Sequence, residues 1–200
     1  MFDAKLRKLI DPPMNAAARW VAGSGVSANA LTIFGALVGL AAAIAISQEQ
    51  FTTGLILILV NRILDGFDGA VARINGPSEY GGYLDTLADF LFYVSVPVAF
   101  GWADQANQLP ALLLVASFTI TAVSFLGFAA IAARKGDEDS ADGPKAFIYS
   151  TGLMEGGETI AFFILFCLFP TYFPVLALLF AVLCVLTVAQ RIVMAAKSLR

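Results

Sequence analysis

Long apolar runs, separated by short polar breaks, dominate the hydrophobic pattern of this chain. No charged residue occurs between Arg19 and Glu49, and the stretch 159–190 is also free of charge. That second stretch is too long for one membrane span, and Pro170 and Pro174 divide it. The pattern predicts an all-α, polytopic membrane protein with six transmembrane helices, at about 27–47, 51–74, 78–101, 109–133, 147–169 and 174–196.

The first 26 residues have a more mixed pattern. Basic side chains alternate with large apolar ones, and Pro12-Pro13 divides the segment. A basic amphipathic segment of this kind lies in the headgroup region of an anionic membrane. We therefore expect an N-terminal interfacial amphipathic helix within residues 1–26 and a single six-helix transmembrane domain over residues 27–200.

Composition supports a membrane protein and limits the possible chemistry. Hydrophobic residues make up 59% of the chain and charged residues only 14%, whereas soluble domains are about half apolar and about one quarter charged. There are no histidines, so a general base must be a carboxylate, lysine, tyrosine or cysteine. Cys167 and Cys184 lie in apolar runs and indicate neither a disulfide nor a zinc site. No nucleic-acid partner is expected.

Four aspartates interrupt the apolar pattern of the second and third predicted helices. Asp65 and Asp68 are three residues apart, and Asp85 and Asp89 are four apart, so each pair shares a helix face. A break at Asn75-Gly76-Pro77 allows the two helices to bring all four carboxylates together. Such a cluster is strongly repulsive without a counter-charge, and hard divalent cations prefer oxygen ligands. The pattern predicts a site for one or two Mg²⁺ or Mn²⁺ ions.

The basic residues predict the orientation in the membrane. The turns at 48–50, 104–108 and 170–173 lie on one side of the six predicted spans and contain no lysine or arginine. All 12 basic residues fall on the other side or in helix ends that face it. By the positive-inside rule, both termini and the aspartate cluster face the cytoplasm, in the cytoplasmic membrane.

Small residues and one arginine accompany the aspartates. Gly69 follows Asp65 by four residues and Ala72 follows Asp68 by four, so the acidic face has room for a ligand close to the backbone. Arg73 can form a forked contact with a phosphate group. Because the chain has neither a P-loop nor a Rossmann glycine pattern, a phosphate or pyrophosphate would depend on the carboxylate–metal cluster.

The complete pattern, Asp65-x2-Asp68-Gly69-x2-Ala72-Arg73-x7-Gly81-x3-Asp85-x3-Asp89, resembles the signature of the CDP-alcohol phosphotransferases, and every fixed position is present. The signature spans about 25 residues, and the six-span layout extends the resemblance to the whole chain. The resemblance implies an enzyme of phospholipid biosynthesis. A CDP-linked donor, usually CDP-diacylglycerol, would pass its substituted phosphate to a small alcohol and release CMP. It also implies a two-metal site and a homodimer.

The resemblance also assigns roles by position. Asp65, Asp68 and Asp85 match the core metal ligands, and Asp89 matches the fourth aspartate, which contacts a second metal and acts as general base. The positions that match contacts with the CDP moiety are Asn29, Thr32, Gly69, Ala72, Arg73 and Gly81. Since Gly81 and Gly82 form a doublet, either glycine could be the one that approaches the nucleotide.

The acceptor alcohol is less well defined by the sequence. Lys135 and Lys145 are placed to receive a phosphorylated acceptor, and glycerol 3-phosphate is the expected one. Glu155 and Glu158, three residues apart near the start of the fifth predicted helix, could instead bind a cationic or polyol acceptor. Inositol phosphate, serine and choline are the alternatives within the same family.

Two other classes of protein share some of these features. An intramembrane prenyltransferase also binds a pyrophosphate through magnesium and two acidic motifs, but such motifs lie far apart in sequence and the fold usually has more spans. A divalent-cation transporter would need polar residues along a path across the bilayer. The outer halves of the predicted helices are almost wholly apolar.

Overall fold

The computed structural model describes residues 14–139 and 153–198, and every regular element within these ranges is helical. A first helix covers residues 14–23. The later elements are α2 (Ala28–Ser47), α3 (Phe51–Asn75), α4 (Glu79–Ala103), η1 (Gln105–Asn107), α5 (Gln108–Asp139), α7 (Gly156–Leu168), η2 (Pro170–Tyr172) and α8 (Phe173–Ser198). The predicted all-α class is confirmed.

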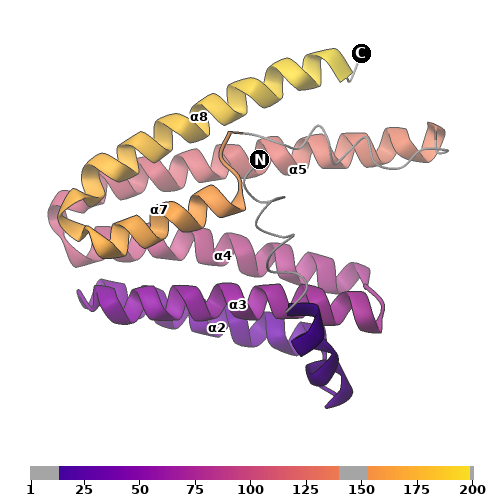
Figure 1. The fold of residues 1–200 in the computed structure, drawn as a ribbon. Coiled ribbons are helices and arrows are strands. Elements are labelled where there is room, and N and C mark those ends of the chain that lie inside the picture. Colours follow the sequence, from indigo (N-terminus) through magenta and orange to yellow (C-terminus); the bar gives the residue numbers. More distant parts are fainter. Residues whose placement is uncertain (1–13, 140–152, 199–200) are drawn as a thin grey trace.

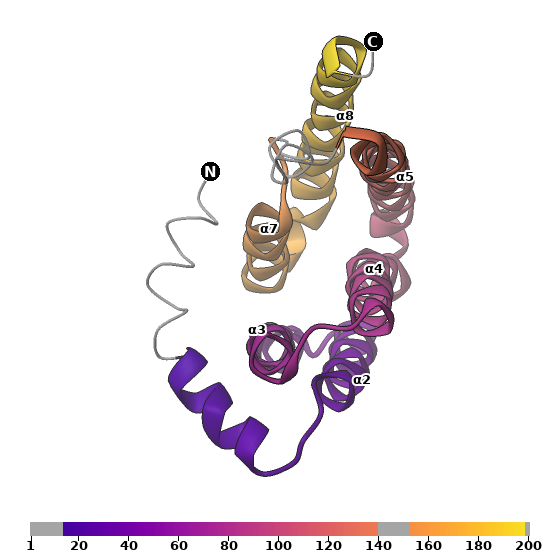
Figure 2. The same ribbon diagram turned by 90° about the vertical axis from the view of Figure 1, so that its right-hand side faces the viewer.

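The long helices form a ring that is seen end-on in Figure 2. Contacts pass round this ring from α3 to α2, α4, α5, α8 and α7, and α7 returns to α3. In Figure 1 the helices lie close together at the end that holds the short turns η1 and η2, and they diverge toward the opposite end. Helix 14–23 and the C-terminal end of α8 both lie at that diverging end.

Local signals explain the ends of the first three long helices, which fall within two residues of the predicted limits. Ser27 caps α2, and its hydroxyl accepts a hydrogen bond from the Ala30 amide. Helix α3 ends at Asn75 because Gly76 has a φ of +94° and Pro77 follows. Ser78 then caps α4, accepting a hydrogen bond from the Gly81 amide at 3.0 Å.

The predicted limits of two helices are wrong. Helix α5 continues to Asp139, so the first part of the predicted loop at 135–145 is helical. No proline occurs between Pro110 and Pro144, so none ends the helix within 135–139. Residues 153–155 are not helical, and α7 begins only at Gly156 rather than near residue 147.

The apolar core fills the end of the bundle where the helices converge. Phenylalanine dominates it: the rings of Phe100 and Phe173 stack with centroids 4.6 Å apart, and those of Phe162 and Phe180 stack at 4.4 Å. The largest fully buried members are Ile46, Ile58, Phe92, Val96, Phe100, Leu114, Phe163, Phe166, Phe173 and Phe180. The polar site therefore lies toward the other, more open end.

Small residues let α2 approach α3 and α4 closely. Thr32, Gly35, Gly39 and Ala42 are buried along one face of α2, with the three- and four-residue spacing of a helix stripe. A Cβ added at Gly39 would lie 3.0 Å from the Phe92 ring and 3.1 Å from the Asn61 amide nitrogen. Helix α2 thus holds α3 and α4 in place through close contacts that larger side chains would prevent.

Helix 14–23 packs against α3 through a small apolar cluster of its own. Ala18, Ala70 and Val71 are its buried residues. On the same short helix, Trp20 is 87% exposed. The amphipathic character of this segment stays a prediction, and its residues 1–13 lie outside the described residues.

Four helical segments in the described part of the chain are long and apolar enough to cross a bilayer: Ala28–Ser47, Glu79–Ala103, Gln105–Ile131 and Pro170–Lys197. Helix α3 has 25 residues, but charged residues interrupt its apolar pattern. Helix α7 has 13 residues, about 20 Å at 1.5 Å per residue, which is shorter than the roughly 30 Å of a hydrocarbon core.

The close contacts of Gly39 lead to a stability prediction. Replacing Gly39 with Ala forces apart a buried ring and an anchored amide, and we expect a loss of about 1–3 kcal/mol in the free energy of unfolding. Gly127→Ala is the control, because a Cβ at Gly127 meets no described atom within 4 Å. Thermal unfolding of the detergent-solubilised proteins measures both. Equal unfolding temperatures for Gly39→Ala and the wild type would contradict this account of the packing.

Candidate metal and nucleotide site

The four predicted aspartates lie on facing helices. Asp65 and Asp68 are on α3, Asp85 and Asp89 are on α4, and both helices pack against α2. The turn at 75–78 reverses the chain between them, as the sequence predicted. Secondary structure and packing therefore bring two separate acidic pairs to one place.

Three of these carboxylates form one cluster. Asp65, Asp68 and Asp85 each offer an oxygen, and these oxygens all lie within 4.8 Å of one another. Asp68 is the most deeply buried of them, and its Oδ2 accepts a 2.6 Å hydrogen bond from the Thr32 hydroxyl on α2. Oxygen ligands about 2.0–2.6 Å from a central ion suit Mg²⁺ or Ca²⁺, so the spacing fits a hard divalent cation.

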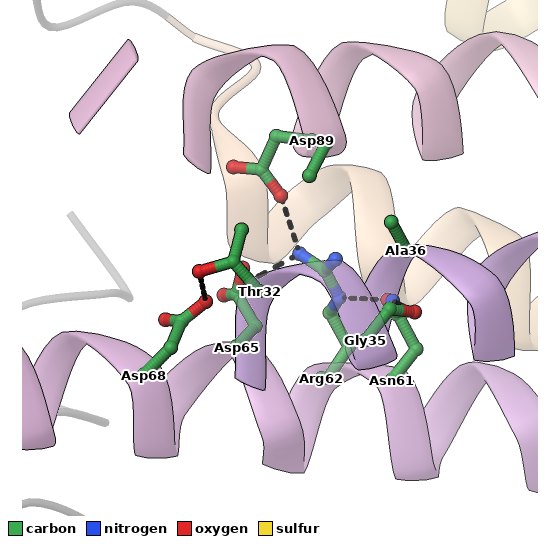
Figure 3. A pocket seen from close by; sticks show the side chains of 9 residues that line it. Thr32, Gly35, Ala36, Asn61, Arg62, Asp65, Asp68 and Asp89 are labelled. Carbon is green, nitrogen blue, oxygen red and sulfur yellow. Dashed lines mark hydrogen bonds and ion pairs between the residues drawn. The ribbon is translucent and has the colours of Figure 1, made fainter. Parts of the chain in front are cut away.

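Asp89 lies at the edge of this cluster and contacts an arginine (Figure 3). The Arg62 Nη1 donates to Asp89 Oδ1 at 3.0 Å, and the same nitrogen is 3.6 Å from Asp65 Oδ2. One guanidinium thus links the α3 pair to the α4 pair. The Asp89 carboxylate forms a hydrogen bond with Arg62 and is not one of the three clustered carboxylates. Its contact with a metal therefore remains a prediction.

Two further contacts hold Arg62 in position. Its Nε donates to the Asn61 side-chain oxygen at 2.8 Å, and the Asn61 amide nitrogen donates to the Gly35 carbonyl of α2 at 2.8 Å. The guanidinium also lies over the Phe92 ring, 4.5 Å from its centroid. Sequence reasoning missed both Arg62 and Asn61. The available signal was a charged residue in an apolar helix, three positions before Asp65.

A cleft of about 300 Å³ opens beside the carboxylates. Asp68 and Asp85 line this cleft. So do five of the six predicted nucleotide-binding residues: Asn29, Thr32, Gly69, Ala72 and Gly81. These residues come from α2, α3 and α4. The structure thus brings most of the predicted nucleotide contacts to one cleft, next to the predicted metal ligands.

The glycine doublet has one crowded and one open member. A Cβ at Gly81 would lie 2.9 Å from the Ser78 hydroxyl and 3.0 Å from the Asn29 side-chain oxygen, whereas a Cβ at Gly82 would meet nothing within 4 Å. Gly81 is therefore the position where the first turn of α4 approaches α2 closely.

Arg73 lies outside the lining of the cleft. Its side chain is exposed, its Nη1 lies 3.5 Å from the place of a Cβ on Gly69, and its Nη2 is 3.5 Å from the Asn15 side-chain oxygen. The guanidinium is thus next to Gly69 and faces helix 14–23. Its phosphate contact remains a prediction.

The predicted acceptor residues are only partly described. Glu155 and Glu158 form a capping box, in which each side chain accepts a hydrogen bond from the other residue's backbone amide. This gives the pair a structural role at the start of α7. Lys145 and the side chain of Lys135 lie outside the described residues.

The carboxylate cluster predicts how the protein responds to a metal. We expect Asp85→Asn to weaken Mn²⁺ binding at least about tenfold, because it removes one of three charged ligands. Titration calorimetry and the Mn²⁺-dependent rise in unfolding temperature measure this. Glu79→Gln is the control, since Glu79 is an exposed acid in the first turn of the same helix. Equal Mn²⁺ binding by Asp85→Asn and the wild type would exclude Asp85 as a ligand.

Comparison with known proteins gives the same family as the motif. The family model for CDP-alcohol phosphatidyltransferases matches residues 26–197. The chain is 38% identical over 193 residues to the inner membrane protein YnjF of Escherichia coli K12, covering 96% of this chain and 94% of that one. It is 37% identical over 95 residues to the archaetidylinositol phosphate synthase of Pyrococcus horikoshii, covering 46% and 50% of the two chains.

Solved structures share the fold. The phosphatidylinositol phosphate synthase of Mycobacterium tuberculosis, crystallised with CDP-DAG, has a TM-score of 0.65 at 23% identity and covers 90% of this chain and 92% of that one. Its complex with manganese and citrate has a TM-score of 0.67, also at 23% identity, with coverage of 92% and 89%. With the family model matching most of its length, this chain belongs to the CDP-alcohol phosphatidyltransferase family, and it is a transferase of substituted phosphate groups.

Proposed function

We propose that this protein transfers the phosphatidyl group of CDP-diacylglycerol to a small alcohol and releases CMP. The observation that carries the proposal is the contact between the three-carboxylate cluster and the cleft, since Asp68 and Asp85 belong to both. A pyrophosphate in that cleft would lie beside the cluster. The CDP-DAG complex of a structural neighbour supports the choice of donor.

Different residues would hold the metal and the nucleotide. Asp65, Asp68 and Asp85 would hold Mg²⁺ or Mn²⁺. When bound, the cation offsets negative charge on the donor pyrophosphate and on the departing CMP. Asn29, Thr32, Gly69, Ala72 and Gly81 line the space for the nucleotide. Manganese in a structural neighbour supports the choice of metal.

Asp89 is the proposed general base. As the acceptor oxygen bonds to the phosphatidyl phosphorus, the bond from that phosphorus to the CMP oxygen breaks, and Asp89 takes the proton of the acceptor hydroxyl. Its position at the edge of the cluster supports this role, because the carboxylate lies outside the three-aspartate group but next to it. Positioning of the reactants would supply much of the rate.

The acceptor is proposed to be a phosphorylated polyol. Glycerol 3-phosphate is the expectation from the sequence, with Lys135 and Lys145 as its phosphate contacts. Inositol phosphate is the second candidate, supported by the archaetidylinositol phosphate synthase that matches about half of this chain. Homodimerisation and the roles of Glu155 and Glu158 in acceptor binding stay predictions.

The proposed topology has six spans, with the site and both termini at the cytoplasmic face of the cytoplasmic membrane. Exposed aromatic residues at both ends of the bundle support it, since such residues favour membrane interfaces. Trp102 and Tyr172 lie at the end that holds η1 and η2, and Trp20 and Tyr80 lie at the other. Helices α3 and α7 would supply the fifth and sixth spans, and helix 14–23 would lie in the interface. The similarity to an inner membrane protein supports the location.

The reaction predicts a specific pattern of CMP release. With Mg²⁺ or Mn²⁺ and CDP-diacylglycerol, the purified protein should release CMP with one acceptor from a panel of glycerol 3-phosphate, inositol 1-phosphate, inositol, serine and choline. Asp89→Asn should lower this rate about 10²- to 10⁴-fold, the usual contribution of a general base. Asp104→Asn is the control, because Asp104 lies at the opposite end of α4.

Two results would contradict these assignments. Turnover of Asp89→Asn at the wild-type rate would exclude Asp89 as the base. Absence of CMP release with every acceptor, together with absence of CDP-diacylglycerol binding, would exclude the donor.

The topology predicts which side of the membrane a labelling reagent reaches. In a background without Cys167 and Cys184, we expect Gln105→Cys to react with an impermeant maleimide on intact cells. Ser24→Cys should react only after permeabilisation. Both positions are exposed in turns, at opposite ends of the bundle. The reverse pattern would mean that the protein has the opposite orientation.

A further inference from the structure

We propose that Arg62 is a positioning residue whose guanidinium supplies a fixed positive charge on the Asp65–Asp89 side of the carboxylate cluster. It would hold Asp89 in place for the transfer reaction. The role of Asp89 rests on the proposed function, whereas the charge of Arg62 beside the cluster does not. The signature of the family resemblance begins at Asp65 and does not include this arginine.

The geometry places the guanidinium where the two acidic pairs meet. A single nitrogen, Nη1, lies 3.0 Å from Asp89 Oδ1 and 3.6 Å from Asp65 Oδ2. The three-aspartate cluster shares Asp65 with this arrangement but leaves Asp89 out. The positive charge of Arg62 therefore lies on the Asp65–Asp89 side of the cluster.

The position of Arg62 is fixed by groups other than the carboxylates. Asn61 connects its Nε to the Gly35 carbonyl on α2 through two hydrogen bonds of 2.8 Å. The Phe92 ring supports the flat face of the guanidinium, and the Arg62 side chain is only 17% exposed. Figure 3 shows Arg62 between Asn61 and Asp89. Such an anchored side chain loses little conformational freedom when it pairs with Asp89.

A fixed positive charge has opposite effects on metal binding and on transfer. It lowers the negative potential at the three-carboxylate cluster, so a neutral residue at position 62 should make that cluster bind a divalent cation more tightly. The same change releases Asp89, so transfer should slow. A residue with a merely structural role would weaken both processes when replaced.

The test uses Arg62→Gln in the full-length protein. Glutamine is neutral and keeps a polar side chain beside Asn61. We expect its Kd for Mn²⁺, measured by titration calorimetry without donor, to fall about tenfold, with a larger Mn²⁺-induced rise in unfolding temperature. The kcat for CMP release should fall at least tenfold, while the KM for CDP-diacylglycerol stays within about threefold of the wild type.

Arg62→Lys is the conservative variant, and it decides the question if Arg62→Gln does not fold. Because lysine keeps the charge, its Kd for Mn²⁺ should stay within about threefold of the wild type. Its kcat should fall less than that of Arg62→Gln, because charge is restored but the forked geometry is not. Lys197→Gln is the control for a change of charge outside the site, since Lys197 is exposed near the end of α8.

The outcomes separate this inference from the proposed function. Mn²⁺ binding by Arg62→Gln that is unchanged or weaker than in the wild type would overturn the inference, and so would weaker Mn²⁺ binding by Arg62→Lys. An unchanged kcat in Arg62→Gln would overturn the positioning of Asp89. A wild-type protein that releases no CMP would refute the proposed function, while the Mn²⁺ titrations would still decide the role of the charge.

Discussion

The mutual repulsion of four carboxylates in an otherwise apolar bundle is the constraint on which the functional end of this protein depends. Burying a carboxylate in such surroundings raises the free energy of the folded protein unless a positive charge and hydrogen bonds offset its lost hydration. The protein supplies part of this compensation itself, through the Thr32 hydroxyl on Asp68 and the Arg62 guanidinium on Asp89 and Asp65. Three of the carboxylates still converge and are suited to a divalent cation.

Helix α2 makes this arrangement possible, although it contributes none of the acids. Its small buried residues, Gly35 and Gly39 among them, let α3 and α4 come near enough for their side chains to meet. The same helix supplies Thr32, the Gly35 carbonyl that anchors Asn61, and Asn29 at the cleft. A change in the packing of α2 would therefore disturb both stability and the site.

The two ends of the bundle have different physical characters. Stacked phenylalanines fill the end where the helices converge, so the helix positions are set there by close packing. At the other end the helices diverge, and polar side chains and the cleft replace the apolar core. The packed half fixes the helices in place, and the open half contains the carboxylates and the cleft.

By itself, the sequence determined the helical class, most helix limits, the four aspartates and the family, because apolar periodicity and a short motif are local features. It also identified Asn29, Thr32 and Gly81, which tertiary packing brought to the cleft. Only the tertiary structure showed that Asp89 pairs with Arg62, that Asn61 joins Arg62 to α2, and that Gly81 is the crowded member of its doublet. It also replaced the predicted helix start near 147 with Gly156, where Glu155 and Glu158 cap each other's backbone. These features depend on which helices meet and on the distances between side chains far apart in the chain, and no local pattern encodes those distances.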